Sequence, residues 1–225
     1  MPLFMKLLAI DTAMEACSVA VLTESGTPVV VSEILGRGHA ERLVGMVESA
    51  MREVGLGFPD LDRIAVTVGP GSFTGLRVGI AAARGFALVT GRPVVGVGTL
   101  EAHARSVRDT AGAVPVMAVL DARRDEIYGQ RFHADGTPAT AAEVGPAGYF
   151  ASLLELGDAL AGSGADLVAA QAEQDVTILH RRASPDILAV AALGRAAIPD
   201  GSPPRPLYLR PPDAKPQAAK AVARR

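Results

Sequence analysis

Short apolar runs alternate with longer amphipathic stretches along the first half of the chain, separated by glycine or small polar residues. Apolar runs bounded by turn residues predict strands, and apolar positions recurring every three or four residues predict helices. The stretch from His39 to Val54 follows the helical pattern, with Leu43, Val47 and Met51 opposite most of its charged residues. The predicted order is β-β-β-α-β-α-β, with strands at 7–12, 18–23, 29–32, 64–68 and 93–97 and helices at 39–54 and 76–89.

This order is that of a ribonuclease-H-like unit, in which parallel strands extend an antiparallel meander through helical crossovers. The same pattern of strands and turns begins again with a predicted strand from Val114 to Asp121. Glu126 to Phe132 is predicted to be its antiparallel neighbour. We therefore expect an α/β protein with a first lobe at 1–108 and a smaller second lobe at 109–225. The second lobe is expected to contain helices near 148–156 and 185–197 and a proline-rich extended tail from residue 203 to 216.

Composition narrows the class of protein. The chain has 225 residues, 49% of them hydrophobic, which is enough for a substantial core. The net charge of −2 argues against a chain that grips nucleic acid alone, and a single cysteine excludes an internal disulfide framework. The longest apolar stretch is interrupted by Arg84, and the N-terminus lacks the pattern of a signal peptide. A cytoplasmic protein without a membrane span is the expectation.

The strongest local signal is the glycine-rich stretch from Gly69 to Gly79, between a predicted strand and a predicted helix. It lacks the Gly-Lys-Ser/Thr of a Walker A loop, and its third glycine falls one residue late for the dinucleotide fingerprint. Spacing alone favours a tight strand-to-helix turn. The alternative is that the free N–H groups at the helix start bind a phosphate.

A second signal is Asp11 at the end of the first strand, because a carboxylate beside a hairpin can orient metal-bound phosphate. The alternative is that Asp11 only satisfies the amides of a turn. The candidate nucleotide-binding residues are Asp11, Thr12, Ser18, Gly69, Gly71, Ser72 and Gly75.

The two helices of the first lobe have unusual compositions. The second is rich in glycine and alanine, which lets another backbone approach closely, and the first carries two adaptable methionines. Internal packing and contact with a partner are about equally favoured by these patterns. The candidate partner-interface residues are Met46, Met51, Leu76, Gly79, Ala82, Ala83 and Phe86.

The sequence offers little sign of a metal site or of a catalytic nucleophile. The four histidines do not form a metal-binding spacing with one another or with Cys17, so no metal site is expected. The charged run 121–126 is typical of a solvated turn, with a contact to RNA or a partner as the alternative. No nucleophile elbow is present.

Several of these stretches resemble one family. Leu8–Thr12, Cys17–Ala20, His39–Leu43 and Val68–Gly79 are similar to the TsaB family, also called YeaZ. Val95–Ala102, Leu120–Arg124 and Pro206–Arg210 fit the same family. The resemblance covers residues 7–132 and returns at the Pro-Leu-Tyr-Leu-Arg segment.

The resemblance implies an actin-like ATPase (ASKHA) fold of two ribonuclease-H-like lobes. It also implies a scaffold role in forming N6-threonylcarbamoyladenosine at adenosine 37 of tRNAs that read codons starting with A. The partners would be the catalytic paralogue TsaD, in a heterodimer, and the ATPase TsaE, with tRNA contacted only through the complex. A homodimer is expected when the chain is isolated. No intrinsic cofactor is expected, and ATP is a candidate ligand at or near the TsaD interface.

TsaD-like proteins carry a metal-binding His-x-x-x-His pair after the fifth strand. Here Thr99 and His103 stand at that spacing, so one ligand is missing and the chain is expected to be non-catalytic. The first alternative is an actin-fold ATPase or small-molecule kinase that uses Asp11 and the loop 69–75. The second is a metallopeptidase with a metal bound at His103.

Overall fold

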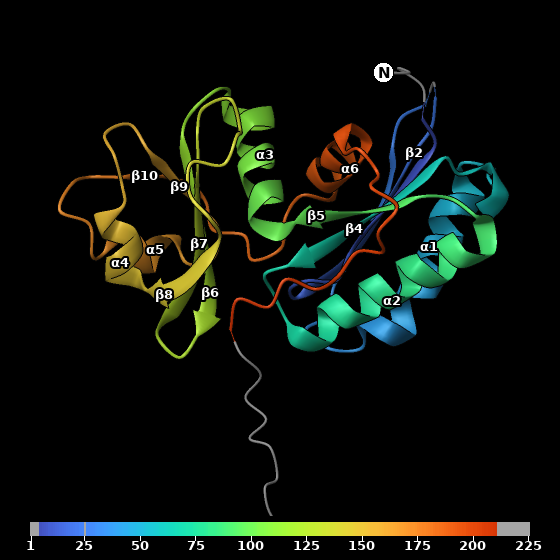
Figure 1. Ribbon diagram of the computed structural model, residues 1–225, viewed down its shortest axis with the longest axis horizontal. Coiled ribbons are helices and arrows are strands. Elements are labelled where there is room, and N and C mark those ends of the chain that lie inside the picture. The colour runs from blue at the N-terminus through green and yellow to red at the C-terminus, as the bar shows by residue number, and fades with distance from the viewer. Residues whose placement is uncertain (1–4, 25, 211–225) are drawn as a thin grey trace, which may run out of the picture.

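The computed structural model describes residues 5–24 and 26–210, and Figure 1 shows their arrangement in two lobes. The part of the predicted tail beyond residue 210 lies outside the described residues. The first lobe is built on a five-stranded sheet of order β3-β2-β1-β4-β5. Its strands are antiparallel from β3 to β1 and parallel from β1 to β5. Its elements are β1 (Leu7–Asp11), β2 (Ala16–Leu22), β3 (Val29–Ile34), α1 (His39–Glu53), the short 3-10 helix Phe58–Asp60, β4 (Arg63–Gly69), α2 (Phe73–Thr90) and β5 (Val94–Gly98).

The second lobe repeats this topology. Its five strands have the order β10-β9-β6-β7-β8, which becomes that of the first sheet when read from β8 to β10. The expected duplication and the β-β-β-α-β-α-β order are therefore confirmed. The elements that follow β5 in the chain are α3 (Thr99–Ala111), β6 (Val116–Arg123), β7 (Glu126–Phe132), β8 (Glu143–Pro146), α4 (Ala147–Ser152), β9 (Ala159–Ala161), α5 (Ala165–Ala169), β10 (Thr177–His180) and α6 (Ile187–Ala196).

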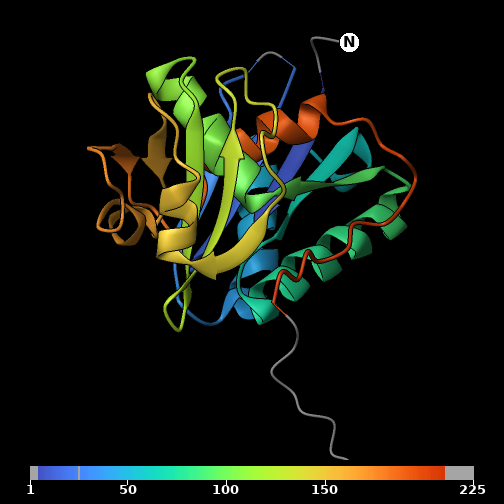
Figure 2. The same ribbon diagram turned by 60° about the vertical axis from the view of Figure 1, so that its left-hand side comes forward.

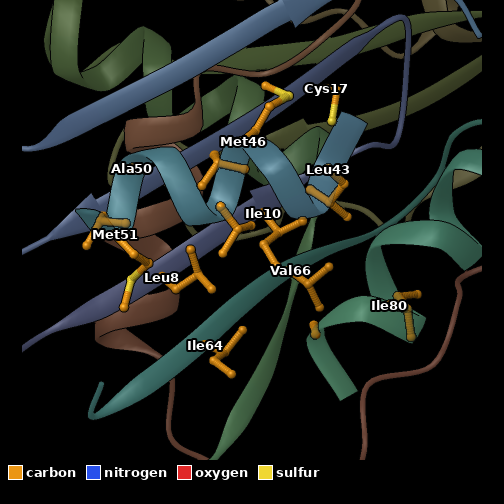
Figure 3. Packing of buried hydrophobic residues seen from close by; sticks show 14 of the residues in the cluster. Leu8, Ile10, Cys17, Leu43, Met46, Ala50, Met51, Ile64, Val66 and Ile80 are labelled. Atoms are coloured by element: carbon orange, nitrogen blue, oxygen red, sulfur yellow. The ribbon is translucent and has the colours of Figure 1, made fainter. Parts of the chain in front are cut away.

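Helices α1 and α2 cover one face of the first sheet, and the largest core lies beneath them. Figure 3 shows Leu8 and Ile10 of β1 meeting Leu43 and Met46 of α1, with Ile80 of α2 close by. The apolar stripe of each helix thus faces the sheet, as the helical periodicity predicts. Although α2 has the length and apolar composition of a membrane span, its inner side is part of this core.

Helix α6 packs on the other face of the first sheet, although it follows the second sheet in the sequence. A Cβ at Gly194 would lie 2.3 Å from the Cβ of Ala65, so only glycine permits this approach. The buried Arg63 guanidinium donates to the carbonyls of Gly194, Arg195 and Ala197 at the end of α6. The first lobe therefore includes a segment from beyond the boundary expected at residue 108.

The lobes meet through two helices: α3 packs on β6 of the second sheet and also against α6. After α6, the chain continues without helix or strand, and we call residues 203–210 the C-terminal strap. Figures 1 and 2 both show the strap running alongside α2. The Leu207 amide donates to the carbonyl of Val68 in β4, and Arg210 pairs with Glu126 of β7. The strap therefore links the two lobes.

Candidate functional site: the inter-lobe cleft and helix α2

The glycine loop packs directly on the turn between β1 and β2. A Cβ at Gly71 would lie 2.5 Å from the carbonyl oxygen of Ala13, and one at Gly75 would lie 2.1 Å from that of Thr12. One helical turn later, a Cβ at Gly79 would lie 2.4 Å from Thr12 Oγ1. Real Cβ atoms do not approach backbone oxygens this closely, so these glycines are required by contact with the turn.

Hydrogen bonds also join the glycine loop to the turn between β1 and β2. The Ser72 amide donates to the carbonyl of Ala13 at 2.7 Å, and Thr12 Oγ1 donates to the carbonyl of Gly75 at 2.7 Å. The Gly75 amide donates to Ser72 Oγ at 3.3 Å, which is a helix N-cap. These donors are therefore satisfied within the chain, and the turn interpretation of the loop accounts for its glycines.

Asp11 lies beneath this contact and is fully buried. Its Oδ1 accepts from Thr67 Oγ1 at 2.6 Å and from the Ala13 amide at 3.1 Å, while Oδ2 has no partner among the described residues. Burial raises the pKa of the Asp11 carboxyl to about 6, against the lowering effect of these hydrogen bonds. Asp11 therefore takes up a proton far more readily than a solvated carboxylate.

The remaining nucleotide candidates, Ser18 and Gly69, lie on the strands next to β1. Ser18 lies on β2, where its hydroxyl pairs with that of Ser32 at 2.7 Å. Gly69 has a φ of 116°, and a Cβ there would lie 2.9 Å from the carbonyl oxygen of Leu207 in the strap. The structure thus brings Thr12, Gly71, Ser72 and Gly75 together, with Ser18 opposite Asp11 in the β1–β2 pairing and Gly69 against the strap.

A cleft of about 660 Å³ lies between the lobes, beside the glycine loop. Gly71 and Ser72 line its first-lobe side together with Met14 and Glu15 of the β1–β2 turn. The second lobe contributes Asp121, Ala122, Arg123, Tyr128, Ser163, Arg181, Arg182 and Ala183. Asp11 is not among the lining residues. A polar ligand in the cleft would therefore meet three arginines and two serines, and also the carboxylates of Glu15 and Asp121.

His103 of α3 is buried at the lobe boundary, beside a second histidine that is distant in sequence. Its ring lies 5.2 Å, centroid to centroid, from that of His180 on β10, and its Nε2 lies 3.2 Å from the carbonyl oxygen of Ala183. Burial lowers the pKa of His103 to about 3, and burial with nearby Arg182 lowers the pKa of His180 to about 4. Both imidazoles are therefore neutral near pH 7.

Thr99, four residues before His103, is buried at the start of α3. Within residues 5–24 and 26–210, no three His, Cys, Asp or Glu side chains converge as metal ligands would. The pairing of His103 with His180 joins residues 77 positions apart in the sequence, and no local motif could have indicated it.

Most of the residues predicted for the partner interface are buried within this chain. Met46, Met51, Leu76, Gly79 and Ala83 are buried in the first-lobe core, because they occupy the stripes that α1 and α2 turn toward the sheet. Ala82 and Phe86 are partly buried, with the Phe86 ring 4.8 Å from that of Phe58. Side chains buried in this way are not available to a second protein.

The exposed side of α2 carries different residues. Leu88 and Val89 are 87% and 85% exposed, and Phe73 at the other end of the helix is 47% exposed. Ala81 and Gly85 are small and exposed between them, beside the charged Arg77 and Arg84. Neighbouring apolar side chains left in water are costly unless another surface covers them. The C-terminal part of this outer side, around Leu88 and Val89, is therefore the better candidate for a partner surface.

Two ribonuclease-H-like lobes that enclose a cleft place the chain in the actin-like ATPase class of folds, as the motifs predict. The family model described as "TsaD: tRNA N6-adenosine threonylcarbamoyltransferase" matches residues 20–177. The crystal structure of YeaZ from Pseudomonas aeruginosa superposes with a TM-score of 0.78 at 33% identity, over 91% of this chain and 100% of that one. The chain belongs to the TsaB/YeaZ group of the TsaD family.

Two further relatives match the chain over different lengths, and the first of them carries the TsaB name. The "tRNA threonylcarbamoyladenosine biosynthesis protein TsaB" of Escherichia coli is 42% identical over 131 residues, which are 58% of this chain and 56% of that protein. The chain thus matches about half the length of this relative. An uncharacterised protein of Mycobacterium bovis is 40% identical over 214 residues, 94% of each chain.

Proposed function

We propose that the chain is a non-catalytic subunit required for forming N6-threonylcarbamoyladenosine at adenosine 37 of tRNA. In this proposal it forms a heterodimer with a TsaD-family subunit and acts together with a TsaE-family ATPase. The name of the Escherichia coli relative and the matching family model support the pathway. The homodimer of the isolated chain and its cytoplasmic location stay predictions.

The exposed outer side of α2 is the observation that carries the role of a partner subunit. Leu88 and Val89 offer apolar surface that the described part of the chain does not cover. Fully burying two such side chains stabilises an interface by about 3 kcal/mol, or roughly 100-fold in affinity. A helix with a tightly packed inner side can present this surface with little loss of conformational freedom on binding.

Two features support a non-catalytic role. Thr99 replaces a histidine at the spacing that holds metal in TsaD-like proteins, and His103 is fully buried beside His180. A metal in a transferase must keep a position open to its substrate, which a buried imidazole with this neighbour does not offer. In the proposal, the transfer to adenosine takes place on the TsaD-family subunit.

Reconstitution of tRNA modification tests the proposal. Unmodified tRNA is incubated with the TsaD-family and TsaE-family subunits and the enzyme that makes threonylcarbamoyl-adenylate, with and without this chain. Mass spectrometry of the digested tRNA measures the modified nucleoside. We expect modification only when the chain is present together with the TsaD-family subunit. Modification of equal extent without the chain, or by the chain without that subunit, would contradict the proposal.

An actin-fold ATPase or small-molecule kinase is the second candidate, because the cleft beside Gly71 and Ser72 has room for a ligand of nucleotide size. Against it, Asp11 is held by Thr67 and Ala13 and does not line the cleft. Calorimetry of the isolated chain with ATP and magnesium separates the two functions. Binding with turnover that is lost in Asp11→Ala would favour the enzyme over the subunit.

A further inference from the structure

An exposed aromatic pair lies where the C-terminal strap crosses the first turn of α2. Phe73 and Tyr208 are 47% and 41% exposed, and their ring centroids are 5.2 Å apart. The Arg77 guanidinium carbon lies 4.0 Å from the centroid of the Phe73 ring, and Arg77 Nε donates to the Tyr208 hydroxyl at 3.1 Å. Three side chains from two segments thus form one layered arrangement at the surface.

Arginines continue this arrangement onto the second lobe. Arg210 is two residues beyond Tyr208, so their Cα atoms are within about 7 Å of each other. The Arg210 guanidinium pairs with Glu126 and lies 6.0 Å from the centroid of the Tyr128 ring. It also donates to the carbonyl of Arg123, whose own side chain is 86% exposed. We call Phe73, Arg77, Arg123, Tyr208 and Arg210 the aromatic–arginine patch.

The backbone beside the patch holds an unusual conformation. Arg123, Arg124 and Asp125 have φ values of 64°, 58° and 59°, all in the left-handed region. Each non-glycine residue there costs about 1 kcal/mol or more. Asp121, Asp125 and Glu126 lie in the same hairpin and equal the three arginines of the patch in number; Arg123 pairs with Asp121 and Arg210 with Glu126. Strong binding by charge alone is therefore not expected.

The chemistry of the patch fits unpaired nucleotides. Aromatic rings and guanidinium planes stack on bases that are free of a duplex, and guanidinium groups bind the neighbouring phosphates. A paired helix offers its phosphates but not the faces of its bases. A protein partner fits the patch less well, because the exposed aliphatic side chains of α2 lie at its other end. Leu88 is 15 positions from Phe73, or about 22 Å along the helix.

We propose that the aromatic–arginine patch binds unpaired nucleotides of an RNA loop. This inference rests on the proposed function, in which the substrate is tRNA and the modified adenosine is in a loop. The patch adds contacts to the RNA that the assembled complex holds, and the distance along α2 leaves the partner surface free at the same time.

Fluorescence anisotropy of the full chain with a labelled RNA hairpin tests the inference. The hairpin has an unpaired loop that contains adenosine, and a blunt RNA duplex of equal length is the comparison. We expect the hairpin to bind more tightly than the duplex at low salt, and binding to weaken as salt rises. Equal affinity for hairpin and duplex, or no binding of the hairpin, would overturn the proposal.

Substitutions locate the contact. Tyr208→Ala is expected to weaken hairpin binding about tenfold, because stacking on one base contributes on the order of 1–3 kcal/mol. Tyr208→Phe keeps the ring and should bind within about twofold of the wild type. Arg123→Gln should weaken binding and flatten its salt dependence. Arg92→Gln, a matched loss of charge at the far end of α2, should change neither.

Further results distinguish an RNA contact from a protein contact at the patch, and the failure of this inference from the failure of the proposed function. Unchanged hairpin binding by Tyr208→Ala, combined with weaker assembly with the TsaD-family subunit, would make the patch a protein contact and overturn the inference. If tRNA modification requires the chain while patch variants bind the hairpin normally, the inference fails and the proposed function stands. If patch variants lose hairpin binding while modification proceeds without the chain, the function fails and the inference stands. Circular dichroism of each variant checks that it is folded.

Discussion

The two lobes share one topology but differ in their helices. The outer face of the second sheet is covered by α4 and α5, which have six and five residues. In the first lobe, α1 and α2 have 15 and 18 residues. The second lobe thus shows how little helix this topology needs. Near the end of α2, Phe86 and Ala87 pack against the first-lobe core while Leu88 and Val89 face solvent, and we interpret this exposed pair as a surface for a partner.

Both lobes place a glycine against the backbone of a neighbouring segment just after the fourth strand of the sheet. In the second lobe, Gly162 follows the fourth strand as the glycine loop does in the first, and a Cβ there would lie 2.1 Å from the carbonyl oxygen of Val119. At Gly75 the corresponding distance to the carbonyl oxygen of Thr12 is also 2.1 Å. Because both lobes share this feature, the glycines are explained by the fold. They do not by themselves indicate a nucleotide.

The largest effect should come from adding a methyl group to this packing. Gly75→Ala places a Cβ against backbone that cannot move aside, so we expect a loss of about 4 kcal/mol in the free energy of unfolding, measured in urea. Gly148→Ala, in the short helix α4 with open space around it, is the matched control. A Gly75→Ala protein as stable as the wild type would show that the loop is not packed as described.

The buried carboxyl of the first lobe should give the next largest effect. The pKa of Asp11 is raised to about 6 in the folded chain, so between about pH 4 and 6 the folded state keeps a proton that the unfolded state releases. The stability contributed by Asp11 is therefore present below this window and is lost as pH rises through it. A shift of about two pKa units corresponds to about 3 kcal/mol.

Asp11→Asn isolates this contribution, because the amide does not titrate. From pH 4 to 6 the wild type should lose stability relative to the Asp11→Asn variant. Above pH 6 the difference between their free energies of unfolding should stay constant. Chemical denaturation at a series of pH values measures it. A difference that is constant with pH would mean that Asp11 ionises normally.

A smaller effect tests whether α6 belongs to the first lobe, where it covers the sheet face opposite α1 and α2 as α3 covers the corresponding face of the second sheet. Arg63→Met keeps the length of the side chain but removes the donor to three carbonyls at the end of α6. We expect a loss of about 2 kcal/mol, measured by urea denaturation. Arg52→Met, on the exposed side of α1, should change stability by less than about 0.5 kcal/mol. Equal effects of the two substitutions would contradict the assignment.

The smallest effect distinguishes the two sides of α2. Gly85 is exposed, and no atom lies within 4 Å of the position that a Cβ would take there, so Gly85→Ala should stabilise the chain by about 0.5–1 kcal/mol. Thermal unfolding measures the gain. A loss of stability at Gly85 comparable to that at Gly75 would mean that both sides of the helix are packed.

Much of the fold could be predicted because its signals are local. Apolar runs, turn residues and helical periodicity give the element order, and the repetition of a strand ending in Asp11 and Asp121 indicates the duplication. The return of α6 to the first sheet could not be predicted, because it depends on contacts such as Gly194 with Ala65 that are distant in sequence.

The candidate site was less predictable for the same reason. Periodicity shows that α1 has an apolar stripe but not whether a sheet or a partner covers it. The pattern therefore leaves core packing and partner contact equally favoured for Met46 and Met51, and the structure places both in the core. The meeting of His103 with His180 and the crossing of Tyr208 over Phe73 depend on how the lobes pack. Neither leaves a mark in the local sequence.

The most direct test of the account combines Leu88→Glu with Val89→Glu and measures association with the TsaD-family subunit. Leu156→Glu is the control, because this leucine of the second lobe is 96% exposed. We predict that the double variant folds normally but associates about 100-fold more weakly and supports modification only at high concentration, while Leu156→Glu matches the wild type. A double variant with wild-type association and activity would contradict the claim that the outer side of α2 is the partner surface.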